Sequence, residues 1–306
     1  MSDFFRLLLG TMVLRPYVFV FLAAYLVAAS AHLGWKKALA YVPLGYCIAW
    51  ISEFSSIHWG FPYGDYYYIP ATIDRELWVF GVPFMDSLSY VFLSYCSYST
   101  AIFLLSPVYI GKGTVLILET RRLRRSWQTV VLGAFLFVLL DIIIDPVALQ
   151  GYRWFLGQIY GYRHQGLYFG IPMSNFGGWL LVGLVMMAAL SRLDRISALE
   201  SSAAPFPLNA IPGVRLFGPL LYCSVLAFNL AVTFWIGEHL LGLVGCLILF
   251  FSGLTAAFWT RYKIENLSAG AVYAHFRDFP SPSEYRVVEP FLQAAVPDES
   301  IQVGGG

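Results

Sequence analysis

Long apolar runs separated by short polar segments dominate this chain. The runs are close to the about 20 residues that a helix needs to cross a bilayer, and they cover residues 16–34, 38–58, 78–105, 127–149, 174–191, 214–236 and 239–260. Their apolar positions are continuous and do not alternate with polar ones, so membrane-spanning strands are not expected. The pattern predicts an all-α fold, a polytopic transmembrane helical bundle of about seven spans.

Three details refine this prediction. The third run is expected to break near Pro83, and the segment 61–76 is a candidate for an extra re-entrant piece. After Arg261 the chain turns polar, which predicts a single transmembrane domain over residues 1–265 and a polar tail over residues 266–306. The final Gly304-Gly305-Gly306 is interpreted as a cloning scar.

Composition and charge agree with a membrane protein. Of the 306 residues, 58% are hydrophobic and 12% are charged, whereas an average soluble chain has about 25% charged residues. A net charge of +1 gives no reason to expect nucleic acid as a partner. With seven spans, fourteen of the 19 Lys and Arg residues fall on one side, which should be cytoplasmic. We expect an integral protein in contact with membrane lipid, in a bacterial cytoplasmic membrane, with its N-terminus outside and its C-terminus in the cytoplasm.

Carboxyl groups within the apolar runs are the main functional signal. Asp141 and Asp145 lie one helical turn apart in Leu-Leu-Asp-Ile-Ile-Ile-Asp-Pro, so they share a helix face. A carboxyl at membrane depth is costly and suggests a function. Because two neighbouring carboxyls do not readily ionise together, one is expected to keep its proton. It would then be able to protonate an apolar substrate; the alternative is hydrogen bonding between helices.

Two further acids are expected at the same depth. Glu53 lies near the outer end of the second run, and Asp86 lies about two helical turns inside the outer end of the third run. Three helices would then supply one pocket, roofed by the aromatic segments 59–76 and 150–173. Glu53 is a candidate for a second acid or for a base that activates water, or it reaches the interface; Asp86 is a further acid or a helix cap.

Aromatic and polar residues near these acids are candidate substrate contacts. The stretch 61–68 contains Asp65, Tyr66 and Tyr68, and aromatic faces can line a polyene channel and stabilise a carbocation. An interfacial aromatic belt is the alternative. Asn175 begins the fifth run and would cap it or hold a water molecule. His58 and His164 lie near the same mouth but lack the spacing of metal ligands, so neither a metal nor a cofactor is predicted.

Four blocks of sequence together resemble a known family. They are Gly64-Asp65-Tyr66-Tyr67-Tyr68, Gly81-Val82-Pro83, Asp141 to Ala148 with Trp154 downstream, and Gly170-Ile171-Pro172 with Asn175, Phe176 and Trp179. Over about residues 50–180 their order resembles the integral-membrane carotenoid biosynthesis family that includes the acyclic carotenoid 1,2-hydratases, of the bisanhydrobacterioruberin and γ-carotene hydratase type. Where that family would have a Trp in the third span, this chain has Ser87 and Tyr90 instead.

The resemblance implies a cofactor-independent hydro-lyase that adds water to the terminal C1=C2 double bond of an acyclic ψ-end group. Its substrate would be lycopene, γ-carotene or a bacterioruberin precursor. An acid would protonate C2, and water would capture the tertiary cation at C1. We expect Asp141 or Asp145 to be the acid and Glu53 to orient water, with Asp86 able to replace either. The pocket would be lined by Tyr66, Tyr68, Trp154 and Trp179.

Two other functions stay open. A lycopene-type cyclase would share the first step but capture the cation with an alkene, and the sequence lacks a Pro-x-Glu-Glu block. A non-enzymatic carotenoid-binding or proton-coupled transport protein would need a continuous polar path across the membrane, whereas the predicted acids lie in one leaflet.

Overall fold

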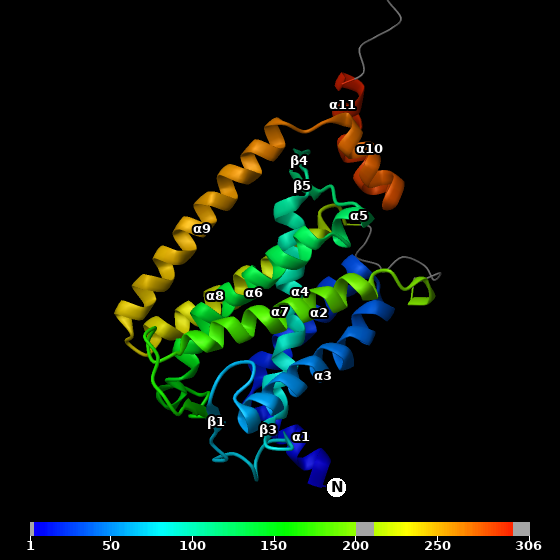
Figure 1. Cartoon of the computed structure of the whole chain (residues 1–306). Helices are drawn as coiled ribbons and strands as arrows, with labels where there is room; N and C mark the ends of the chain where they lie inside the picture. Colours follow the sequence, from blue (N-terminus) through cyan, green and yellow to red (C-terminus); the bar gives the residue numbers. More distant parts are fainter. Residues whose placement is uncertain (1–2, 200–210, 296–306) are drawn as a thin grey trace, which may run out of the picture.

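Long helices occupy all seven apolar runs and form a bundle in the computed structural model, which describes residues 3–199 and 211–295 (Figure 1). They are α2 (Pro16–Leu33), α3 (Trp35–Trp59), α4 (Phe84–Leu105), α6 (Trp127–Ala148), α7 (Met173–Leu193), α8 (Phe217–Trp235) and α9 (His239–Glu265). Among the described residues, six helices are long and apolar enough to cross a membrane. α3 has sufficient length but is less apolar, since it carries Lys36, Lys37 and Glu53. The prediction of an all-α transmembrane bundle is confirmed.

Shorter elements connect these helices. The remaining α-helices are α1 (Asp3–Leu14), α5 (Arg121–Arg124), α10 (Ala269–Asp278) and α11 (Pro282–Ala295), with 3-10 turns at Gly151–Arg153, Ser197–Leu199 and Val214–Leu216. The described strands form antiparallel pairs: β1 (Tyr66–Tyr68) with β6 (Tyr160–Tyr162), β2 (Trp78–Val79) with β3 (Val82–Pro83), and β4 (Val108–Gly111) with β5 (Thr114–Ile117).

The third apolar run begins as a hairpin and not as a helix. Residues 78–83 form β2 and β3, and the turn residues Phe80 and Gly81 have φ angles of 51° and 83°. Two successive positive φ angles are what a tight two-residue hairpin requires. The expected span 78–105 is therefore too long at its start, and Asp86 lies in the first turn of α4 instead of two turns inside. The segment 61–76, where a re-entrant piece was a candidate, is a loop that carries β1.

α4 is the centre of the bundle, and α9 is its outlying member. α4 contacts α2, α3, α6, α7 and α8, and 78% of its apolar window is buried, against 17% for α9. Figure 1 shows α9, in yellow to orange, leaning away from the other helices. It packs on α8, and near its end Trp259 Nε1 and Lys263 Nζ donate hydrogen bonds of 2.7 Å to the carbonyl oxygens of Leu104 and Phe103. Most of its apolar surface therefore remains available to lipid.

The segment expected to be a polar tail contains two helices that pack against the β4–β5 hairpin. Val272 of α10 and Val288 and Leu292 of α11 form a small core with Leu116 and Leu118, separate from the core of the bundle. The division into a domain of residues 1–265 and a tail of residues 266–306 stays a prediction. The proposed scar, residues 304–306, lies outside the described residues.

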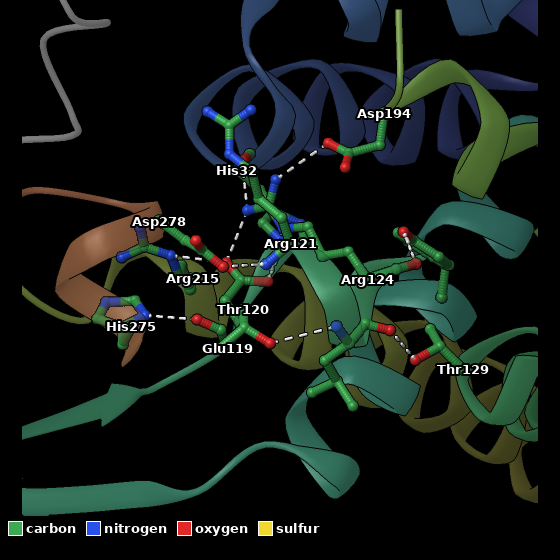
Figure 2. Close-up of polar contacts among 12 residues, drawn as sticks. His32, Glu119, Thr120, Arg121, Arg124, Thr129, Asp194, Arg215, His275 and Asp278 are labelled. Carbon is green, nitrogen blue, oxygen red and sulfur yellow. Dashed lines mark hydrogen bonds and ion pairs between the residues drawn. The ribbon is translucent and has the colours of Figure 1, made fainter. Parts of the chain in front are cut away.

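A buried cluster of ion pairs joins several helices near α5 and α10, and Figure 2 shows Glu119 within it. Arg124 donates to both carboxylate oxygens of Glu119 at 2.8 and 2.6 Å, and Arg215 donates to one of them at 2.7 Å. A ring nitrogen of His32 lies 3.1 Å from the same carboxylate, and His275 Nδ1 lies 2.7 Å from the Glu119 carbonyl oxygen. This residue therefore ties together α2, α5, α10 and the turn before α8.

We expect Glu119→Gln to destabilise the protein by about 3–5 kcal/mol, because breaking a buried ion pair leaves its partner uncompensated. Burial alone would raise the pKa of Glu119, but the interactions with Arg124 and His32 together outweigh this effect and hold the pKa well below its ordinary value. Its contribution to stability is therefore complete above the ordinary glutamate pKa and is lost as pH falls through the lower folded-state pKa.

Thermal unfolding in detergent, followed over a range of pH, measures both effects. The control is Glu265→Gln, which removes an exposed ion pair with Arg261 and should change the melting temperature little. Equal melting temperatures for the two variants would contradict the structural role of Glu119.

Candidate active site

Carboxyl groups from three helices gather at the end of the bundle opposite the Glu119 cluster. Glu53 comes from the last turns of α3, Asp86 from the first turn of α4, and Asp141 and Asp145 from the second half of α6. Glu53, Asp141 and Asp145 are buried, and Asp86 is half-buried. The local reason is the course of the chain: α3 and α6 run toward this end, and α4 begins there.

A two-stranded sheet covers these carboxyls with tyrosines. β1 and β6 are far apart in the sequence, and their pairing places Tyr66 opposite Tyr162 and Tyr68 opposite Tyr160. Alternate residues of a strand point to the same face, so these four side chains face the carboxyls. Tyr67, between two of them, points the other way and is 43% exposed. We call the four inward-facing tyrosines the tyrosine roof.

Glu53 and Asp86 are joined through one hydroxyl group. Glu53 accepts hydrogen bonds from Tyr66 and Tyr68 on Oε2 and from Tyr90 on Oε1, with a Tyr68 Oη to Oε2 distance of 2.6 Å. The Tyr68 hydroxyl also contacts Asp86 Oδ2. Both carboxyls and the hydroxyl between them therefore form a continuous hydrogen-bonded chain.

Asp141 and Asp145 are joined through an amide. Tyr160 and Tyr162 donate to Asp145 Oδ1 and Oδ2, each at 2.7 Å. Asn175 Nδ2 donates to Asp145 Oδ2 at 3.1 Å and to Asp141 Oδ2 at 2.8 Å. The other oxygen of Asp141 is buried without a hydrogen-bond partner among the described residues, so Asp141 has capacity for one more polar contact.

Burial raises the pKa of all four roof tyrosines, and the nearby carboxyls, chiefly Glu53 for Tyr66, Asp86 for Tyr68 and Asp145 for Tyr160 and Tyr162, raise it further. Their hydroxyl groups therefore stay protonated over the physiological range and remain donors. Of the described residues that line the space around Glu53, none is Lys or Arg. The side-chain hydrogen bonds that these acids accept come from neutral donors, the tyrosine hydroxyls and the Asn175 amide.

Two cavities meet at these acids. One has a volume of about 110 Å³ and is mainly apolar, with Met85, Phe92 and Trp154 in its wall. The other, of about 50 Å³, is polar and is lined by Glu53, Asn175 and the tyrosine roof. A single water molecule needs only about 10–15 Å³ of such space, so the polar cavity has room for water. The residues common to both walls are Asp86, Tyr90, Asp145, Tyr160 and Trp179.

Most of the residues predicted from the sequence line these cavities. Tyr66, Tyr68 and Asn175 line the polar cavity, Trp154 lines the apolar one, and Trp179 lines both. Asp65 is exposed and lies outside both of these cavities. Asp141 also lies outside them and reaches the site through Asn175. No group of three or more His, Cys, Asp and Glu residues in the described ranges is arranged to hold a metal ion. The catalytic and binding roles of these residues stay predictions.

Sequence reasoning missed five of the tyrosines that line the cavities, which are Tyr17, Tyr63, Tyr90, Tyr160 and Tyr162. Tyr90 lies four residues after Asp86, a spacing that places both on one helix face, so the sequence did contain a signal for it. Tyr160 and Tyr162 have the alternation of Tyr66 and Tyr68, but only the pairing of β1 with β6 brings them to the acids.

A family model described as "Carotenoid biosynthesis protein" matches residues 7–251. No curated protein and no solved structure matches the chain. The matched range contains all four carboxyls, the tyrosine roof and both cavities, and it ends before α10 and α11.

We expect Tyr68→Phe to lower the stability by about 1–3 kcal/mol, because it leaves the Glu53–Asp86 chain without its central hydroxyl. Tyr67→Phe is the matched control: the same change is made one residue away in the same strand, on the opposite face. Unfolding by heat in detergent compares the two. If the two substitutions had the same effect, the alternation of β1 over the carboxyls would be wrong.

Proposed function

Since the chain belongs to the carotenoid biosynthesis protein family, we propose that it is a carotenoid 1,2-hydratase. The reaction adds water across the terminal C1=C2 double bond of an acyclic ψ-end group and gives a tertiary alcohol. The substrate is an acyclic-ended carotenoid of the lycopene, γ-carotene or bacterioruberin-precursor type. Its place would be the bacterial cytoplasmic membrane, with the carboxyl site in the outer half.

The observation that carries this proposal is the meeting of an apolar and a polar cavity at two carboxyls, Asp86 and Asp145. Hydration of an alkene brings together a reactant that prefers an apolar space and one that prefers a polar space. An alkene end group in the apolar cavity and a water molecule in the polar cavity would have these acids between them. A cyclase needs the first space but has no use for the second.

Proton counting supports Asp86 as the acid. A hydroxyl group has one proton to donate, yet the Tyr68 hydroxyl lies within hydrogen-bond distance of both Glu53 and Asp86. Glu53 accepts from Tyr66 and Tyr90 as well, which is the environment of a carboxylate. We therefore assign the Tyr68 proton to Glu53 and a proton of its own to Asp86. This assignment prefers Asp86 to the Asp141 and Asp145 of the sequence-based expectation.

The reaction then follows in balanced steps. Asp86 donates its proton to C2, and the π electrons of C1=C2 form the new C–H bond, which leaves a cation at C1. The faces of Tyr90 and Trp179, stacked with centroids 4.8 Å apart, lie between the two cavities and would stabilise this charge. Water in the polar cavity forms the C–O bond.

Glu53 takes the proton that this water releases. The Tyr68 hydroxyl passes a proton on to Asp86 while it receives one from Glu53, so both acids return to their starting states. Asp145 is held by three donors and supplies a fixed negative charge opposite the cation. Asp141 and Asn175 position Asp145 and are not expected to touch the substrate.

Expression in a lycopene-producing host, followed by mass analysis of the pigments, tests the reaction. We expect products heavier by one water molecule per reacted end group. A product of unchanged mass but altered ring content would identify a cyclase. Carotenoid that binds to the purified protein without any change would identify a binding or transport protein. Either result would overturn the hydratase proposal.

The same assay tests the acid. Asp86→Asn should lower product formation by about 10²–10⁴-fold, the usual contribution of a general acid. Asp74→Asn, an identical change at an exposed carboxyl with no proposed role, should leave it unaltered. An Asp86→Asn protein that is expressed normally and keeps full activity would exclude Asp86 as the proton donor.

A further inference from the structure

The apolar cavity is too small for the whole of the proposed substrate. Its volume is about 110 Å³, whereas pockets that enclose a drug-sized ligand hold about 300–1,000 Å³. A carotenoid is a rod roughly as long as the hydrocarbon layer is thick, about 30 Å. Only an end group fits inside, so the conjugated chain must leave the cavity through one of its walls.

One wall of this cavity reaches the outside between α2 and α8. Tyr17 and Phe21 of α2 and Phe228 of α8 line the cavity and are only half-buried. Phe228 meets Tyr17 and Phe21 with ring centroids 5.5 and 5.7 Å apart. The rings of these three residues close the wall here. None of the three makes a side-chain hydrogen bond between α2 and α8. An apolar chain that enters between these rings would exchange ring–ring contacts for ring–polyene contacts and break no hydrogen bond.

Aromatic rings continue from this wall to exposed residues at the surface of the bundle. Trp154 lines the cavity and packs on Phe155 at 4.9 Å. Phe155, which is 48% exposed, also contacts Tyr17 at 5.6 Å and Trp235 at 6.3 Å. Trp235, at the end of α8, is 68% exposed. The rings therefore connect the buried end-group cavity to the surface of the bundle.

We propose that the conjugated chain of the substrate binds along this seam, defined by Tyr17, Phe21, Phe155, Phe228 and Trp235, while its end group occupies the apolar cavity. The inference rests on the proposed function for the class of substrate. Continuity with the cavity and the length of a carotenoid identify the occupant. The exposed side chains of α9 form a larger apolar surface, but α9 contributes no residue to the cavity wall.

The seam provides what a polyene needs. A conjugated chain is flat and polarizable, and ring faces offer it contact area without a hydrogen-bonding requirement. The seam adjoins the apolar cavity, whereas the tyrosine roof covers the polar one. The substrate would thus enter the protein from the bilayer, with its reacting end group leading.

Binding of lycopene to the purified protein in nanodiscs tests the seam. The experiment uses the Asp86→Asn background, so that binding is measured without turnover, and follows quenching of Trp fluorescence and the induced circular dichroism of the polyene. Phe155→Ser with Phe228→Leu should weaken lycopene binding about tenfold through the loss of two ring contacts. The control is Tyr152→Ser, a more exposed aromatic of the same loop (66% exposed) that lies outside the seam, and this variant should bind as the parent does.

A short acyclic terpene hydrocarbon with the same end group serves as a second probe. Its competition for the cavity should be unchanged in the seam variants, because it does not extend into the seam. If the double variant unfolds, Phe155→Ser alone, on an exposed loop, gives the same comparison. Equal lycopene binding in Phe155→Ser and Tyr152→Ser would overturn the seam.

The two proposals fail separately. If the parent protein binds lycopene through the seam but never adds water to it, the seam proposal is supported and the hydratase proposal is wrong. If the parent protein hydrates lycopene and the seam variants bind and react as the parent does, the hydratase proposal is supported and the seam proposal is wrong.

Discussion

A carboxyl group taken out of water must find hydrogen-bond donors, and this requirement organises the whole protein. The bundle meets it in two ways. Glu119 and Asp194 are bonded to arginines, as is Glu76, whose two oxygens accept from Arg15 at 3.0 Å each. Glu53, Asp86 and Asp145 are bonded to tyrosines.

The choice of partner decides what each acid can do. An arginine does not give up its proton, so it fixes the neighbouring carboxylate as an anion and makes the pair a structural joint. A tyrosine donates to a carboxylate but also accepts from a carboxylic acid, so a proton can move along the chain. The arginine-bound acids accordingly lie at junctions between elements, and the tyrosine-bound acids lie around open space. This contrast is why we place the chemistry at the tyrosine roof.

The sequence predicted the helices because hydropathy over about 20 residues is a strong and local signal. It also predicted that acids from three helices lie at one depth, since depth follows from position along each helix. The prediction from the sequence failed where a local backbone geometry sets the start of a helix, or where a contact between distant segments places a side chain. The two positive φ angles at Phe80 and Gly81 moved the start of α4 and with it Asp86. The pairing of β1 with β6 selected which tyrosines meet which acids, and no local pattern specifies a partner so far along the chain. The packing of α10 and α11 on the β4–β5 hairpin is another contact of this kind.

The arrangement of the two cavities also bears on how a carbocation would be controlled. A cation at C1 reacts with whatever reaches it, so an active site for hydration has to admit one water molecule and exclude the rest. In this protein the proposed polyene path opens toward lipid between α2 and α8, while the polar cavity lies beneath a sheet whose four inward-facing tyrosines all donate to carboxyls. The apolar reactant and water would therefore approach from different sides and meet only at Asp86 and Asp145. Their separation follows from the same constraint as the rest of the fold. The tyrosines that stabilise the buried acids by hydrogen bonding also form part of the boundary between the polar and the apolar cavity.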